Sequence, residues 1–158
     1  MDWLGTLFLY LHVGGVIVAF GPSIAFPLIA AKAAQEPMHG NFVLRTTKFI
    51  TQRVVEPGSV FVFLMGVGLI VTKGYNPLAQ LWVGLAIVLF LITFGYANLV
   101  QLPTLKKMIA MTDQPPPPDA TGPPPAFVAL SAKAERGGQF MGLMLFVILF
   151  LMIVKPFG

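Results

Sequence analysis

His12 is a titratable residue inside a long apolar stretch of the sequence, the stretch from Trp3 to Ala31. It follows Trp3 by nine residues, which places it about 13 Å along a helix and close to mid-bilayer. A titratable side chain at that depth is costly, so it marks a functional site by default. Gly14 and Gly15 leave room beside it for a flat macrocycle or for a closely packed second helix.

An imidazole at this depth suggests haem, whose iron commonly takes His together with a second His or a Met. His39 cannot share an iron with His12, because it lies 27 residues later in a polar connection. Met65 lies seven residues before the end of the next apolar stretch, so its depth matches that of His12. We therefore predict a b-type haem on His12 and Met65, with Gly15 beside it. Alternative second ligands are Met141, Met144 and Met152. In the other interpretation, the methionines fill gaps in a bundle and a neutral His12 bonds a neighbouring helix.

The composition requires a lipid environment. Of the 158 residues, 56% are hydrophobic and 10% are charged, whereas soluble domains average about 25% charged residues. This excludes a soluble enzyme or a nucleic-acid-binding domain, and the net charge of +4 comes from cations that flank apolar stretches. Cysteine is absent, which excludes disulfides and thiolate sites. The expected partner is the lipid bilayer, and no nucleic acid is expected.

Four apolar intervals between charged residues approach or exceed the length of a transmembrane helix, about 20 residues. The intervals are continuously apolar and do not alternate, which argues against the strands of a membrane barrel. We predict an all-α transmembrane four-helix bundle that forms a single domain over residues 1–158. The predicted helices cover residues 3–31, 54–72, 78–101 and 126–154, the last of which enters the membrane near residue 138.

Lysines and arginines divide unevenly between the two ends of this bundle. Eight of the ten lie in the connections between the first and second or the third and fourth membrane-crossing segments. The positive-inside rule places these connections in the cytoplasm and both termini on the extracytoplasmic side. Prolines 115–118 and 123–125 predict a semi-rigid spacer within the connection over residues 112–125. Pro125 suits the first turn of the last helix.

Polar and charged residues near the membrane faces are further candidates. Arg53 and Glu56 begin the second helix three residues apart, so they can pair on one helical face. Lys155 at the outer face can bind anionic headgroups or carboxylates. Interfacial anchoring is the simpler role for all three. Pro22 and Pro27 are expected to kink the first helix, because each removes a backbone donor. A polar patch ends the third helix and consists of Tyr96, Asn98 and Gln101.

Three stretches carry a family resemblance: LYLHVGGVIVAFGPSIAFPLIAAKA, RVVEPGSVFVFLMGVGLIV and IVKPFG. They resemble the first two helices and the Val-Lys-Pro-Phe ending of the HemJ-type protoporphyrinogen oxidases. The matching positions in the first helix are His12, Phe20 and Pro27, and those in the second are Pro57 and Gly66. The resemblance implies a four-helix fold and a b-type haem at His12.

Several polar residues of that family are missing from this chain. Leu28 stands where the family has an Arg, and a second His of the first helix falls at Ala33. The family's His in the third helix is replaced near Gly95 and Tyr96, and its Lys early in that helix is missing. Oxidation of a porphyrinogen needs groups that hold propionates and move protons. The sequence is therefore more similar to a sister family of small bacterial integral membrane proteins of unknown function, which implies a multi-pass protein of the bacterial inner membrane.

Three functions stay open from the sequence. The first is a haem-binding accessory protein or subunit of a membrane redox complex, without catalytic activity of its own. The second is a HemJ-like oxidase that acts on porphyrinogens in haem biosynthesis, and the third is a structural membrane subunit without a cofactor. The apolar surface of the last helix, with Phe146, Phe150 and Ile153, suits lipid or a partner protein. A membrane protein complex or a homo-oligomer is therefore expected.

Overall fold

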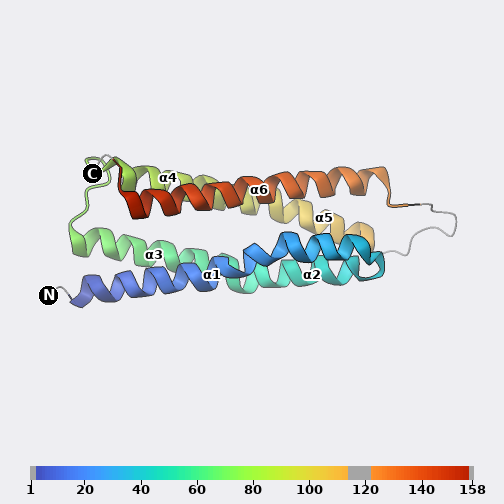
Figure 1. Ribbon diagram of the computed structural model, residues 1–158, viewed down its shortest axis with the longest axis horizontal. Coiled ribbons are helices and arrows are strands. Elements are labelled where there is room, and N and C mark those ends of the chain that lie inside the picture. Colours follow the sequence, from blue (N-terminus) through green and yellow to red (C-terminus); the bar gives the residue numbers. More distant parts are fainter. Residues whose placement is uncertain (1–2, 114–121, 157–158) are drawn as a thin grey trace.

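The protein is an elongated bundle of helices, seen in a computed structural model that describes residues 3–113 and 122–156 (Figure 1). Within these ranges it is all-helical, and four helical stretches are long and apolar enough to cross a membrane. The predicted fold class is therefore confirmed. The first helical stretch begins and the last one ends at one end of the bundle. The third stretch ends and the fourth begins at the other end, which we call the cation-rich end (Figure 1). The side of the membrane on which each end lies stays a prediction, and Pro115–Pro118 fall outside the described residues.

Among the described residues, the four stretches are built from six α-helices and two π-helical segments. The first stretch is α1 (Trp3–Gln35), which a short 3-10 turn, η1 (Pro37–His39), connects to the second. The second stretch consists of α2 (Gly40–Ile50), η2 (Thr51–Val55) and α3 (Glu56–Lys73). The third consists of α4 (Leu81–Tyr96), η3 (Ala97–Gln101) and α5 (Leu102–Thr112). The fourth is α6 (Pro125–Val154), which begins at Pro125 as the sequence predicts.

Three of these stretches extend beyond the predicted helices at the cation-rich end, and the first of them ends at Gln35 instead of residue 31. The second begins at Gly40 instead of residue 54, and the third ends at Thr112 instead of residue 101. Helices α2 and α5 were not predicted, because charged residues interrupt the apolar pattern of these two segments. Lysine, arginine and leucine are good helix formers, and α2 and α5 contain several of them, so the helices continue past the apolar runs.

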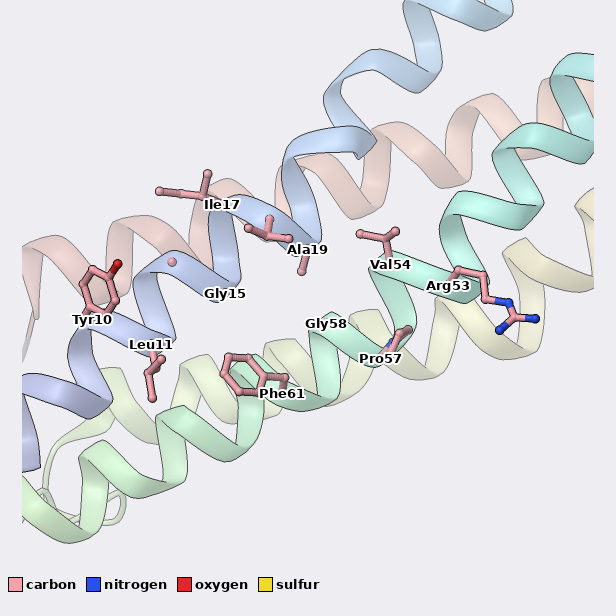
Figure 2. Close-up of a pocket in the computed structure, with 12 residues that line it drawn as sticks. Tyr10, Leu11, Gly15, Ile17, Ala19, Arg53, Val54, Pro57, Gly58 and Phe61 are labelled. Atoms are coloured by element: carbon pink, nitrogen blue, oxygen red, sulfur yellow. The ribbon is translucent and has the colours of Figure 1, made fainter.

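Prolines inside the long stretches alter the helices without ending them. Helix α1 continues through Pro22 and Pro27 and changes direction after Ala19, as Figure 2 shows. The π-helical segments η2 and η3 end two residues before Pro57 and Pro103. Proline lacks an N–H, and its ring clashes with the carbonyl four residues earlier. A π-helical turn is wider than an α-helical turn, and this width relieves the clash.

Small residues let α1 pack directly on α3 in an antiparallel pair. A Cβ atom added to Gly58 would lie 2.6 Å from Cβ of Ala19, and one added to Gly15 would lie 2.9 Å from Cγ2 of Val62. Close approach through small residues is the usual way in which helices pack in a membrane, where the lipid tails supply no hydrophobic drive.

Helices α4 and α6 form the other pair of the bundle. Their core consists of Trp82, Val83, Ala86 and Leu151. Stacked rings of Phe63 and Phe90, with centroids 5.3 Å apart, connect α3 to α4. The bundle is therefore two helix pairs joined by side chains.

The contact of α1 with α3 predicts opposite effects for two glycine substitutions. Gly58→Ala is expected to lower the thermal unfolding midpoint in detergent, because its Cβ also meets Cα of Ala19 at 3.2 Å and overpacking costs about 1–3 kcal/mol. Gly14→Ala is the matched control, since a Cβ there meets nothing within 4 Å. It should leave the midpoint unchanged or raise it slightly, because alanine stabilises helices relative to glycine. Equal midpoints for the two variants would contradict this packing.

Candidate functional site

His12 is tied to the neighbouring helix through its ring. Its Nδ1 lies 2.8 Å from the backbone carbonyl oxygen of Val62 in α3. A carbonyl only accepts hydrogen bonds, so Nδ1 carries the proton and, in the neutral ring, Nε2 keeps its lone pair. Within the part of the chain that the structure describes, no hydrogen bond reaches Nε2. The imidazole is therefore held in one tautomer.

Glycines on both helices determine how close the ring lies to α3. A Cβ on Gly66 would lie 3.1 Å from Cε1 of His12 and 3.3 Å from Nδ1. Any larger residue at position 66 would therefore press on the ring. Gly15 serves the same contact from the α1 side, since it faces Val62. Gly15 therefore packs against a second helix, and its place beside a haem stays a prediction.

Met65 lies beside the position of α3 that faces His12. Gly66 meets the ring, and Met65 precedes it, so the methionine side chain leaves the helix about 100° away. Met65 is half-buried. Of the alternative ligands, Met152 packs against the core of α4 and α6. A shared iron for His12 and Met65 stays a prediction.

A hollow of about 700 Å³ lies on the outer surface of the α1–α3 pair (Figure 2). Its wall is apolar apart from Arg53 and the hydroxyl of Tyr10, and His12 is not part of it. The residues of the wall are Tyr10, Leu11, Gly14, Gly15, Ile17, Val18, Ala19, Arg53, Val54, Pro57, Gly58 and Phe61. The hollow and the His12 ring are therefore separate features of one helix pair.

The possible ion pair between Arg53 and Glu56 is not formed. Ion pairs among residues 3–113 and 122–156 are Lys32–Glu36, Arg45–Asp113 and, when His39 is protonated, His39–Glu36. Residues three apart share a face of an α-helix, but Arg53 lies in the π-helical segment η2. The wider turn changes the angle between the two side chains, so Arg53 lines the hollow and Glu56 does not.

Lys155 packs against aromatic rings at the end of the bundle where the chain termini lie. Its Nζ is 5.4 Å from the centre of the Trp82 ring and 5.7 Å from that of Tyr75, within cation–π range. The residue ends α6 in a left-handed conformation with φ of 50°, and its N–H bonds the oxygen of Leu151. This lysine therefore closes α6 onto the start of α4.

The polar patch that the sequence predicts at the end of the third helix faces α6. Gln101 donates from Nε2 to the carbonyl of Ala134 at 2.9 Å, and its Oε1 is buried without a partner. Gly137 lies opposite, where a Cβ would meet both Oε1 of Gln101 and the hydroxyl of Tyr96. Glycine at this position lets α6 approach two polar side chains.

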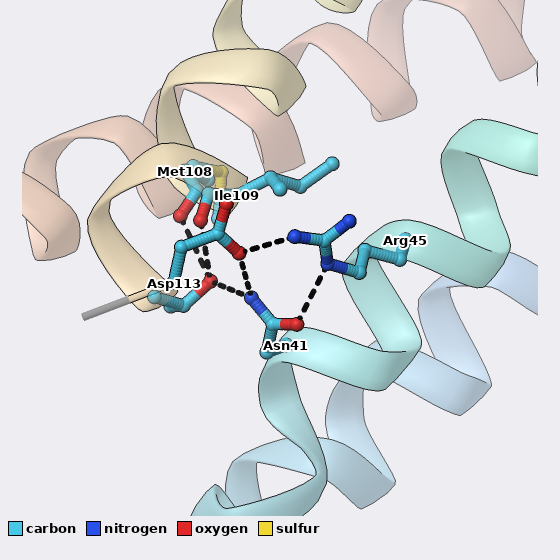
Figure 3. Close-up of polar contacts among 6 residues, drawn as sticks. Asn41, Arg45, Met108, Ile109 and Asp113 are labelled. Carbon is cyan, nitrogen blue, oxygen red and sulfur yellow. Dashed lines mark hydrogen bonds and ion pairs between the residues drawn. The ribbon is translucent and has the colours of Figure 1, made fainter. Parts of the chain in front are cut away.

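Sequence reasoning missed a polar cluster that joins α2 to the end of α5 (Figure 3). Asn41 donates from Nδ2 to Oγ1 of Thr112 and to Oδ1 of Asp113, each at 2.8 Å. Arg45 donates to Asn41 at 2.9 Å and pairs with Asp113 at 2.7 Å. The partners from α2 and from the end of α5 lie 68 to 72 residues apart, so no local spacing could reveal these contacts. The hydrogen bonds from Asn41, and then from Arg45, lower the pKa of Asp113.

Comparison with known proteins identifies the family. Residues 6–156 match the family described as predicted integral membrane protein (DUF2269). The chain belongs to this family. The match confirms the predicted membership of a family of integral membrane proteins and, with the four apolar helices, shows a multi-pass membrane protein. The relation to the HemJ-type oxidases stays a prediction. No curated protein and no solved structure matches the chain.

The cluster at Asp113 predicts a small effect of acid on stability. The pKa of Asp113 is lower in the folded chain than the ordinary 3.8, so its contribution is present above about pH 4 and lost as pH falls through the folded pKa. Below pH 4 the thermal midpoint of the wild type should therefore fall more steeply than that of Asp113→Asn, measured in detergent. Glu135→Gln, an exposed acid on α6, is the control and should follow the wild type. Parallel curves for all three proteins would contradict the role of the cluster.

Proposed function

We propose that this protein binds a b-type haem through Nε2 of His12 and acts as an accessory subunit of a membrane redox complex in the bacterial inner membrane. The supporting observation is the hydrogen bond of 2.8 Å between Nδ1 of His12 and the carbonyl of Val62. Histidines that bind metals usually donate their other N–H to a carbonyl or carboxylate, which orients the ring and leaves one lone pair for the metal. The donor chemistry of His12 therefore fits a haem ligand.

The chain contributes position and environment to this site. Val62 holds the tautomer, Gly66 admits the ring close to α3, and the apolar helices around them limit access of water. Met65 is the proposed second ligand. A bound haem would supply one-electron transfer, with a potential set by its ligands and by burial. This chemistry suits a subunit that passes electrons to or from a partner.

Haem binding is tested by a reduced-minus-oxidised spectrum of protein expressed with ample haem. We expect haem bands in the wild type and their loss in His12→Ala, because the proposed ligand is removed. His39→Ala is the matched control and should keep the bands, since His39 lies in the short turn at the cation-rich end. Bands that survive in His12→Ala would contradict ligation by this residue.

His12→Asn separates ligation from helix packing. The amide nitrogen of asparagine lies near the position of Nδ1, so it can still donate to Val62, but it offers no ligand to iron. We expect this variant to lack haem bands while it keeps most of the thermal stability that His12→Ala loses, about 1 kcal/mol for an interhelical hydrogen bond. No bands in the wild type, with the same difference in stability, would overturn the haem proposal and favour a structural subunit.

The proposal does not extend to porphyrinogen oxidation. Leu28 stands at the position of the Arg in the resembling family and is 71% exposed, and Ala33 stands at that of its second His. Groups that hold propionates and move protons are missing at both positions. We expect expression of this chain to give no growth rescue in a strain that lacks protoporphyrinogen oxidase. Rescue that depends on His12 would contradict the accessory role and favour the oxidase.

A further inference from the structure

The hollow on the α1–α3 pair has the apolar surface of a site for an alkyl chain. It holds about 700 Å³ and is bounded by Tyr10, Ile17 and Phe61. Gly14 on its wall would add a Cβ with nothing within 4 Å, so the missing side chain leaves real space. Alkyl and aromatic groups form most of the surface, and His12 takes no part in it.

Arg53 gives one end of this hollow a positive charge. It is exposed and makes no ion pair within the described ranges. Glu56, the nearest acid along the chain, is not part of the wall, because the π-helical segment changes the angle between the two. The charge of Arg53 is thus available to an anion that occupies the hollow.

The depth of Arg53 suggests which anion that is. From Arg53 to Lys73, at the opposite membrane face, the chain advances 20 residues, or about 30 Å, which is the thickness of the hydrocarbon core. A span that ends at Lys73 would place Arg53 at the edge of the hydrocarbon, where its long side chain can reach the lipid phosphates, and the hollow extends from it into the hydrocarbon. Arginine binds phosphate through two parallel hydrogen bonds.

We propose that the hollow is a binding site for one anionic phospholipid from the leaflet that borders the cation-rich end. Its phosphate pairs with Arg53, and one acyl chain lies along Gly14 between Tyr10 and Phe61. The site lies outside the proposed haem site, and neither site needs the other.

Native mass spectrometry of the delipidated full chain in mild detergent tests this proposal. The probes are phosphatidylglycerol and phosphatidylcholine with identical acyl chains. We expect one retained phosphatidylglycerol, bound about tenfold more tightly than phosphatidylcholine, as one charge-assisted contact allows. Arg53→Gln should remove this preference, and Gly14→Leu should reduce binding of both lipids by filling the hollow. Millimolar inorganic phosphate should not displace the lipid, whereas displacement would show a simple phosphate site and overturn the proposal.

Matched variants on α6 control for charge and for bulk. Arg136→Gln removes an exposed cation, and Gly138→Leu adds a side chain where a Cβ meets nothing within 4 Å. Both should bind lipid as the wild type does. Equal affinity for the two lipids, or an unchanged preference in Arg53→Gln, would overturn the proposal even if Gly14→Leu fails to fold. The haem bands of Arg53→Gln should match the wild type, so either proposal can fail without the other.

Discussion

Direct contact between α1 and α3 determines the positions of the His12 ring and of the hollow. Gly58 and Gly15 bring the two helices close enough for a side chain of one to reach the backbone of the other. The short distance between the helices lets the imidazole of His12 donate a hydrogen bond to the carbonyl of Val62. Hydrocarbon offers no hydrogen-bond partner, so the ring finds its partner in the neighbouring helix. The hollow has a related origin, because Gly14 is a glycine that α3 does not cover.

Prolines explain the second main feature of the fold, which is the pair of π-helical segments η2 and η3. Each π-helical segment ends two residues before a proline, at Pro57 in one stretch and at Pro103 in the other. The helices stay continuous, so the backbone keeps its helical hydrogen bonds except those that each proline, which lacks an N–H, cannot donate. The first of these segments also separates Arg53 from Glu56 and leaves a cation at the end of the hollow.

Much of the fold could be predicted from the sequence, because a bilayer accepts few structures. Runs without charge gave four spans, and the placement of His12 within the first span followed from them. Helices α2 and α5 were missed because their polar residues form no apolar run. The expected pairing of Arg53 with Glu56 assumed α-helical geometry, which the π-helical segment replaces. The contacts of Asn41 with Asp113 and of Gly15 with Val62 join segments distant in sequence, so they became visible only in the folded chain.

The π-helical segments also change the rotational phase of the helices that contain them. An extra residue in one turn rotates all later side chains by about 100° relative to an uninterrupted α-helix. The stretch from Gly40 to Lys73 can therefore present Asn41 and Arg45 to α5 in its first part and Gly58 to α1 in its second. One continuous helical stretch thus contacts α5 and α1 through differently oriented faces. Loss of a single residue within Thr51–Val55 would rotate one of these faces away from its partner, although the apolar character of every span would stay the same.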